Sequence, residues 1–186
     1  MTELTNYSGP YNHELKFADF SKEFLIDLMH TWQYAYMRLS SICYQEVIEQ
    51  FGMEAADKCN LAVWMKVGEK IVPKFAKVGK IEFNSIADGL KVIQLAPDGH
   101  TDGELFQGDV EIISDNHVKT TTTKCRALDY LEGVAPERIE FFCHVLEKNV
   151  MQAYFNNPKV TVTPLKLPPR QSKDEVCCRW EIKLEP

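Results

Sequence analysis

The chain has 186 residues, of which 45% are hydrophobic and 26% are charged, and this balance excludes a disordered or fibrous protein. It carries 21 Lys and Arg against 27 Asp and Glu, a net charge of −6 that argues against a nucleic-acid partner. No segment approaches the roughly 18 apolar residues of a membrane-spanning helix, and the first residues lack a signal-peptide pattern. We therefore expect a cytoplasmic protein without a membrane partner, built as a single domain over residues 1–186.

Residues 1–80 are expected to form a mainly helical N-terminal half. Ser21 is suited to cap a long helix that ends at Gly52, and apolar side chains recur along it at spacings of three and four. A second helix is predicted over about 54–72, with Pro73 near its end. Together they predict an antiparallel helical hairpin. The side chains expected to face inward are Phe24, Leu25, Leu28, Met29, Trp32, Tyr36, Leu39, Cys43 and Val47 in the first helix, and Cys59, Val63, Val67 and Ile71 in the second.

Residues 81–186 are expected to form an α/β half. Ser85 and Asp88 predict a capping box for a short helix that ends near Leu95. From Phe106 onward the apolar period changes to two, which predicts two strands joined by a turn over 114–117.

The end of the chain completes this half. A further helix is predicted over about 136–154, and its apolar stripe includes Cys143. A hairpin with strands over 160–165 and 176–184 follows it. The sequence thus predicts an α+β fold, in which an N-terminal helical hairpin is followed by a small antiparallel sheet packed against helices.

Six cysteines are spread along the chain without any Cys-x-x-Cys spacing. On the last strand, the alternation of side chains predicts that Cys178 points inward and Cys177 outward. Glu140 and Cys143 lie one helical turn apart, and Cys125 precedes them between a strand and a helix. Three thiolates and one carboxylate can hold zinc in a tetrahedral site, and iron is the alternative metal. Spacing alone favours a different interpretation, in which the cysteines are small buried hydrophobes and Glu140 is a solvated charge.

Four segments carry a resemblance to a known family: Asn-Tyr-Ser-Gly-Pro at 6–10, Phe-Ala-Asp-Phe-Ser-Lys-Glu-Phe at 17–24, Pro-Leu-Lys-Leu-Pro-Pro-Arg at 164–170 and Cys-Cys-Arg-Trp-Glu-Ile-Lys-Leu at 177–184. They resemble an uncharacterised family similar to L-2-amino-thiazoline-4-carboxylate hydrolase, over nearly the whole chain. The C-terminal half more distantly resembles the 4-vinyl-reductase domain, a small-molecule-binding fold in which three cysteines and a glutamate hold zinc.

This second resemblance implies a set of metal ligands and makes 81–186 the ligand- and metal-binding half. The implied ligands are Cys125, Glu140, Cys143 and Cys178. The interval from Cys143 to Cys178 is longer here than in the resembling domain, which leaves Cys177 as the alternative last ligand.

We therefore expect a zinc-binding domain that holds a small organic ligand in an apolar pocket beside a Cys3Glu site. The first alternative is a metal-dependent hydrolase of cyclic amidine or amide C–N bonds, with Glu147 as general base. The competing interpretation of Glu147 is a surface carboxylate near Lys148. The second alternative is a structural homodimer whose helical hairpin pairs with another copy.

Several other polar residues carry weaker signals. His100 and Asp102 lie in a Gly-rich stretch that is typical of a surface turn, and His144 is expected to face solvent. Arginines could bind a substrate carboxylate through their paired N–H groups, although beside helices and loops they are usually solvated. These arginines are Arg126, Arg138 and Arg170.

Overall fold

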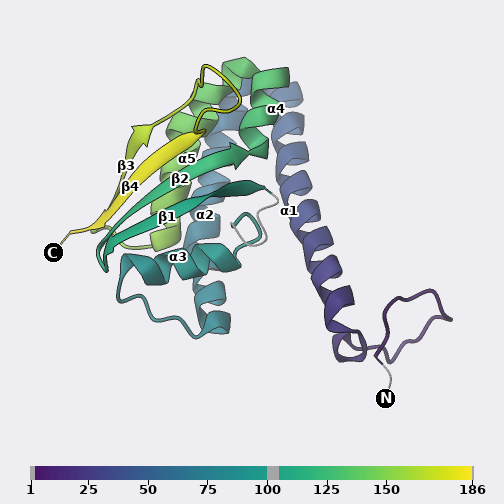
Figure 1. Ribbon diagram of the computed structural model, residues 1–186. Coiled ribbons are helices and arrows are strands. Elements are labelled where there is room, and N and C mark those ends of the chain that lie inside the picture. Colours follow the sequence, from purple (N-terminus) through teal and green to yellow (C-terminus); the bar gives the residue numbers. More distant parts are fainter. Residues whose placement is uncertain (1–2, 100–104, 186) are drawn as a thin grey trace. The chain divides into compact units, whose positions relative to one another are not determined.

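The computed structural model describes residues 3–99 and 105–185 (Figure 1). They fall into two compact units, Met1–Cys43 and Tyr44–Pro186. Neither contains, among the described residues, a helix with the length and apolar character needed to cross a membrane.

The first unit consists of a lead-in segment and most of the long helix α1 (Lys22–Phe51). The Ser21 hydroxyl accepts a hydrogen bond from the Phe24 N–H at 3.2 Å, which confirms Ser21 as the helix cap. Along the helix, however, Met29 is 63% exposed and Trp32 is 52% exposed, so the predicted burial of the apolar stripe is wrong for these side chains. Within its own unit the helix has only the lead-in segment to pack against, and that segment is too short to cover a stripe of this length.

In the second unit, α1 turns directly into α2 (Met53–Gly79). Gly52 makes the turn with a φ of 87°, a conformation that glycine adopts without steric cost. Across the turn, the Tyr44 hydroxyl donates a hydrogen bond of 2.5 Å to Asp57. The predicted helical hairpin is therefore confirmed.

The buried face of α2 differs from the predicted one. Cys59 and Val63 are exposed, and the helix continues through Pro73 instead of ending there. The reason is the close approach of a second helix, because a Cβ added to Gly68 would lie 2.6 Å from the Cβ of Ala153. Because the two helices lie so close, α2 buries the face that carries several small residues and exposes the one with larger aliphatic residues. The buried side of α2 consists of Ala56, Asn60, Trp64, Gly68, Val72 and Ala76.

The remaining chain forms the predicted antiparallel sheet. Helix α3 (Ile86–Leu95) has Ser85 as its N-cap, as predicted, but the Asp88 carboxylate accepts the N–H of Asn84 where a full capping box would use that of Ser85. The strands β1 (Phe106–Ser114) and β2 (His117–Cys125) follow it. The last two strands are β3 (Val160–Lys166) and β4 (Cys178–Leu184). The strand order is β1-β2-β4-β3 and all pairs are antiparallel. The α+β fold class is thus as predicted.

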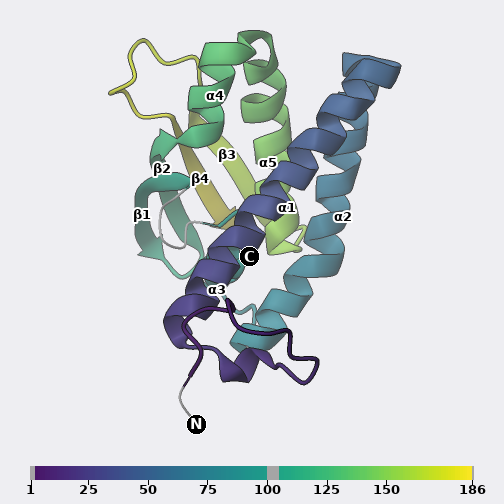
Figure 2. The ribbon, with the colours of Figure 1, turned by 90° about the vertical axis from the view of Figure 1, so that its right-hand side faces the viewer.

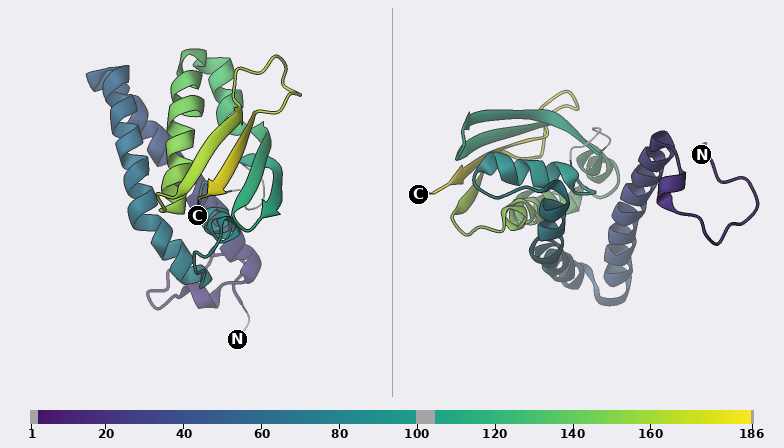
Figure 3. Two further views of the ribbon diagram at one scale, coloured as in Figure 1. Left: turned by 90° about the vertical axis from the view of Figure 1, so that its left-hand side faces the viewer. Right: turned by 90° about the horizontal axis from the view of Figure 1, so that it is seen from below.

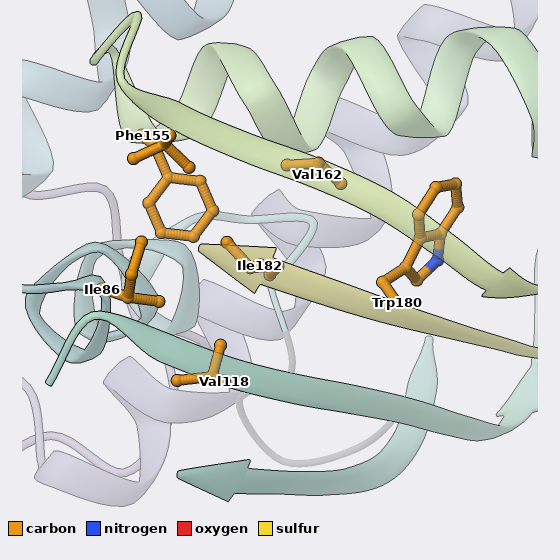
Figure 4. Close-up of a cluster of buried hydrophobic side chains, with 7 residues drawn as sticks. Ile86, Val118, Phe155, Val162, Trp180 and Ile182 are labelled. Atoms are coloured by element: carbon orange, nitrogen blue, oxygen red, sulfur yellow. The ribbon is translucent and has the colours of Figure 1, made fainter. Parts of the chain in front are cut away.

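One face of the sheet packs on helices. Helices α3 and α5 (Glu147–Phe155) contact the strands, and α2 packs against both helices on the side away from the sheet (Figure 3). Figure 4 shows the core between them, where Phe155 and Ile86 point towards Ile182. Its buried members are Ile86, Val118, Phe155, Val160, Val162, Trp180 and Ile182.

The chain between β2 and α5 departs most from the predicted pattern. A short helix missed in the sequence, α4 (Arg126–Val134), follows β2 directly and buries Leu128 and Leu131. The predicted helix over 136–154 is not one regular α-helix. A 3-10 turn, η3 (Pro136–Arg138), precedes a π-helix, η4 (Glu140–Leu146), and only then does α5 begin.

Candidate functional site

Three separate segments bring thiols to one end of the sheet. Cys125 is the last residue of β2, and its sulfur accepts the Leu128 N–H at 3.3 Å as the N-cap of α4. Cys178 is the first residue of β4 and pairs with Thr122 of β2, so it lies near the same strand end. Cys143 comes from the π-helix η4. All three thiols are partly buried and none forms a disulfide.

These thiols and Glu147 form one electrostatic group. Burial raises the pKa of Cys125, and the charges of Glu147, Cys178 and Cys143 raise it further. Burial likewise raises the pKa of Cys143 to about 12, with Glu147 as the largest charge acting on it. In the absence of a cation, the three sulfurs are therefore held as neutral thiols at physiological pH.

Glu147 is the carboxylate of this group. It keeps some solvent contact, yet burial raises its pKa to about 7, and the nearby Asp98 adds to the rise. Asp98 is itself partly buried, and both of its carboxylate oxygens accept a hydrogen bond from the Tyr154 hydroxyl, at 2.5 and 2.7 Å. Within the described chain, no hydrogen bond or ion pair satisfies the Glu147 carboxylate.

Glu140 does not join this group in the structure. It is exposed, and among the described residues it makes no hydrogen bond or ion pair. The π-helix supplies the reason, because its i→i+5 hydrogen bonds place more residues in each turn than the 3.6 of an α-helix. Residues three apart, such as Glu140 and Cys143, are then farther separated around the axis. Residues four apart remain nearly in line, which favours Glu147 as the neighbour of Cys143.

The two adjacent cysteines at the start of β4 have different environments. Cys177 is only 1% exposed, so the prediction that it points outward is wrong. Its thiol donates to the Thr123 carbonyl at 3.4 Å and contacts an N–H of Arg170 at 3.2 Å. The loop between β3 and β4 thus covers the face of the sheet that the alternation assigned to solvent.

Cys178 faces donors that suit a thiolate. The side chains of Thr122 and Trp180 both lower its pKa, against the larger effect of burial. The indole nitrogen of Trp180 is nevertheless buried without a regular hydrogen-bond acceptor among the described residues. A deprotonated Cys178 sulfur would be negatively charged and could accept a hydrogen bond from this indole N–H.

Arg170 fixes the loop that leads to both cysteines. Its side chain is 3% exposed and donates to both carboxylate oxygens of Glu132, to Asp129 and to the Cys177 sulfur. Figure 2 shows this loop beside α4, the helix that carries the two carboxylates. Since these partners occupy the guanidinium, Arg170 serves to hold the loop in place.

Two other predicted positions have structural roles. His144 is partly buried and its Nε2 lies 2.7 Å from the Pro168 carbonyl, so the expectation that it faces solvent is wrong. Arg138 stacks over the rings of Tyr44 and Phe142, with its guanidinium carbon 4.4 and 5.0 Å from their centres. His100 and Asp102 lie outside the described residues.

The three thiols and the Glu147 carboxylate are suitable metal ligands, but in the structure they lie too far apart to hold an ion. Soft thiolates with one carboxylate match the preferences of zinc. Across residues 3–99 and 105–185, however, no three His, Cys, Asp or Glu side chains converge closely enough to hold an ion. Binding would therefore require the side chains to move together.

The comparisons with known proteins add no assignment. No family model matches the chain, and no curated protein or solved structure shows significant similarity to it.

Proposed function

We propose that this protein is a zinc-binding domain in which Cys125, Cys143 and Cys178 bind the metal as thiolates and Glu147 supplies the carboxylate. One observation carries the proposal: three partly buried thiols from separate segments surround one carboxylate, and Glu147 raises the pKa of all three of them. A divalent cation would reverse that penalty, because it stabilises every deprotonated ligand at once.

The proposal replaces Glu140 with Glu147 as the carboxylate ligand. Glu147 is the acidic residue that acts on all three thiols, whereas Glu140 is exposed. Cys178 is preferred over Cys177 as the last ligand, because the thiol of Cys177 is already occupied by Thr123 and Arg170. Iron is the second metal to which this donor set is suited.

The wider proposal follows the sequence resemblance. We propose that the domain binds a small organic ligand, as the 4-vinyl-reductase resemblance implies, in the reducing setting of the cytoplasm. The setting is supported by six cysteines that all remain free thiols.

A hydrolase is the second proposed function, and one observation favours it. The pKa of Glu147 lies at about 7, the range in which a carboxylate serves as a general base near neutral pH. If a metal polarised the C–N bond of a cyclic amidine, Glu147 could accept a proton from the attacking water. In that case it would not be a permanent ligand.

Metal loading of variants tests the site directly. We would load reduced full-length protein with Zn²⁺ or Co²⁺ and measure metal per chain by mass spectrometry and thiolate-to-cobalt absorption. We expect about one ion per chain, and C178S should lower the affinity at least tenfold. C43S, which replaces an exposed thiol of α1, should leave it unchanged.

The two glutamates separate the proposed ligand sets. E147Q should weaken binding by about 10- to 100-fold, the range for loss of a supporting or weak ligand, whereas E140Q should have no effect. The opposite ranking would restore Glu140 as the ligand. Protein that takes up no metal and remains folded would refute the metal site. Hydrolysis of a cyclic amidine that stops in E147Q while metal content is retained would favour the enzyme.

A further inference from the structure

A second site lies at the other end of α5, away from the thiols. A cavity of about 460 Å³ opens between the C-terminal part of α2, the segment 81–83 and the segment 155–158. This volume lies within the range of small-molecule sites. None of the six cysteines lines it. The lining residues are Val72, Pro73, Ala76, Lys77, Ile81, Phe83, Phe155, Asn156, Asn157 and Pro158.

The inner wall of this cavity is apolar and firmly held. Val72, Ala76 and Phe155 are buried, and the small side chain of Ala76 leaves space above it. Phe155 packs so tightly on Gly89 that a Cβ there would lie 2.4 Å from its ring. At the rim, Phe83 remains 43% exposed and has apolar surface that a ligand could cover. The hollow is open to solvent on one side, and its inner wall offers an apolar surface to a ligand.

The wall of the cavity carries one charged side chain, that of Lys77. Between Glu69 and Glu82 the chain carries four lysines and no acidic residue, whereas the whole chain has a net charge of −6. Lys77 lines the cavity and forms no ion pair with any residue that the structure describes. Asn156 lines it as well, at the left-handed C-cap of α5, and its amide can donate a hydrogen bond.

We propose that this cavity binds a small amphipathic monocarboxylate, with its alkyl or aryl body on Phe155 and Phe83 and its carboxylate at Lys77. The apolar wall selects against small hydrophilic anions, and the lysine selects against neutral hydrophobes. The lysines also raise the local concentration of anions. The site is independent of the proposed metal centre, because the two share no residue.

Octanoate and 1-octanol are matched probes for this proposal. Titration of the full chain by saturation-transfer NMR should show tighter binding of octanoate. K77Q should weaken octanoate by about fivefold, the upper range for an exposed ion pair, and leave octanol unchanged. K74Q removes a neighbouring lysine that does not line the cavity and should change octanoate binding less than K77Q does.

The outcomes separate this proposal from the metal site. C143S should leave octanoate binding intact even where metal binding is lost. Octanoate that binds no better than octanol, or that is weakened equally by K74Q and K77Q, would overturn the proposal. A76L fills the cavity and should block both probes, while its unfolding curve reports whether the fold is kept.

Discussion

The close crossing of α2 and α5 allows a quantitative test of the fold. At Gly68 an added Cβ would lie 2.6 Å from the Ala153 Cβ and 2.9 Å from its backbone carbon and oxygen. No rotamer change can relieve contact with a backbone, so the two helices must move apart. Overpacking of this kind costs about 1–3 kcal/mol, and backbone contact places G68A at the upper end of that range.

A second helical glycine supplies the control. Gly133 in α4 has no atom within 4 Å of an added Cβ. Alanine gains helix propensity at both positions, by about 1 kcal/mol at Gly68 in the helix interior and by less at Gly133 in the last turn of α4. The clash at Gly68 outweighs this, and the expected difference in the free energy of unfolding is about 1–3 kcal/mol in favour of G133A.

Urea unfolding followed by circular dichroism measures both free energies of unfolding. A difference of 2 kcal/mol corresponds to about 6 °C in Tm for a chain of this size. If G68A were as stable as G133A, the helices could not be in contact at this point. The assignment of the buried face of α2 would then fail.

Three further predictions follow from buried polar groups and a helix cap. In metal-free protein, the free energy of unfolding should fall as the pH rises from about 4.5 to 7, because the Glu147 carboxyl ionises in this range only in the unfolded chain. In urea titrations at several pH values, E147Q should flatten part of this slope, and an unchanged slope would refute the burial of the carboxylate. R170M should lower the free energy of unfolding by about 3 kcal/mol, because it leaves Glu132 without its cation. Adding E132Q should recover part of this loss, and a double variant no more stable than R170M would argue against the ion pair. S85A should lower the free energy of unfolding by about 1 kcal/mol by removing the N-cap of α3, and a calorimetric Tm equal to that of the parent would contradict this cap.

The elements with strong periodicity or caps were predictable from the sequence. The caps at Ser21 and Ser85 and the turn at Gly52 depend on local chemistry, and each is present as expected. The strand pairs follow from alternation, and Trp180 and Ile182, on the same side of β4 as Cys178, lie in the core. These features need no knowledge of distant contacts.

The sequence predictions fail where contacts between residues far apart in the sequence determine the structure. Apolar side chains occur around much of α2, and the approach of Ala153 to Gly68 selects the face that is buried. Cys177 is buried by a loop held through Arg170, which strand alternation cannot reveal. The prediction that Glu140 lies beside Cys143 assumed the 3.6 residues per turn of an α-helix, and the π-helix has more residues per turn.

The π-helix also makes the position of Cys143 sensitive to chain length. A π segment can be regarded as an α-helix that has accepted a surplus residue, at some loss of helical regularity. Deleting one residue within Glu140–Leu146 would let the backbone relax to the commoner geometry. If that residue lay between Cys143 and Glu147, the two would be three positions apart, about 60° out of line around a regular α-helix. A shorter, more regular helix would thus gain backbone stability while losing the alignment of sulfur with Glu147.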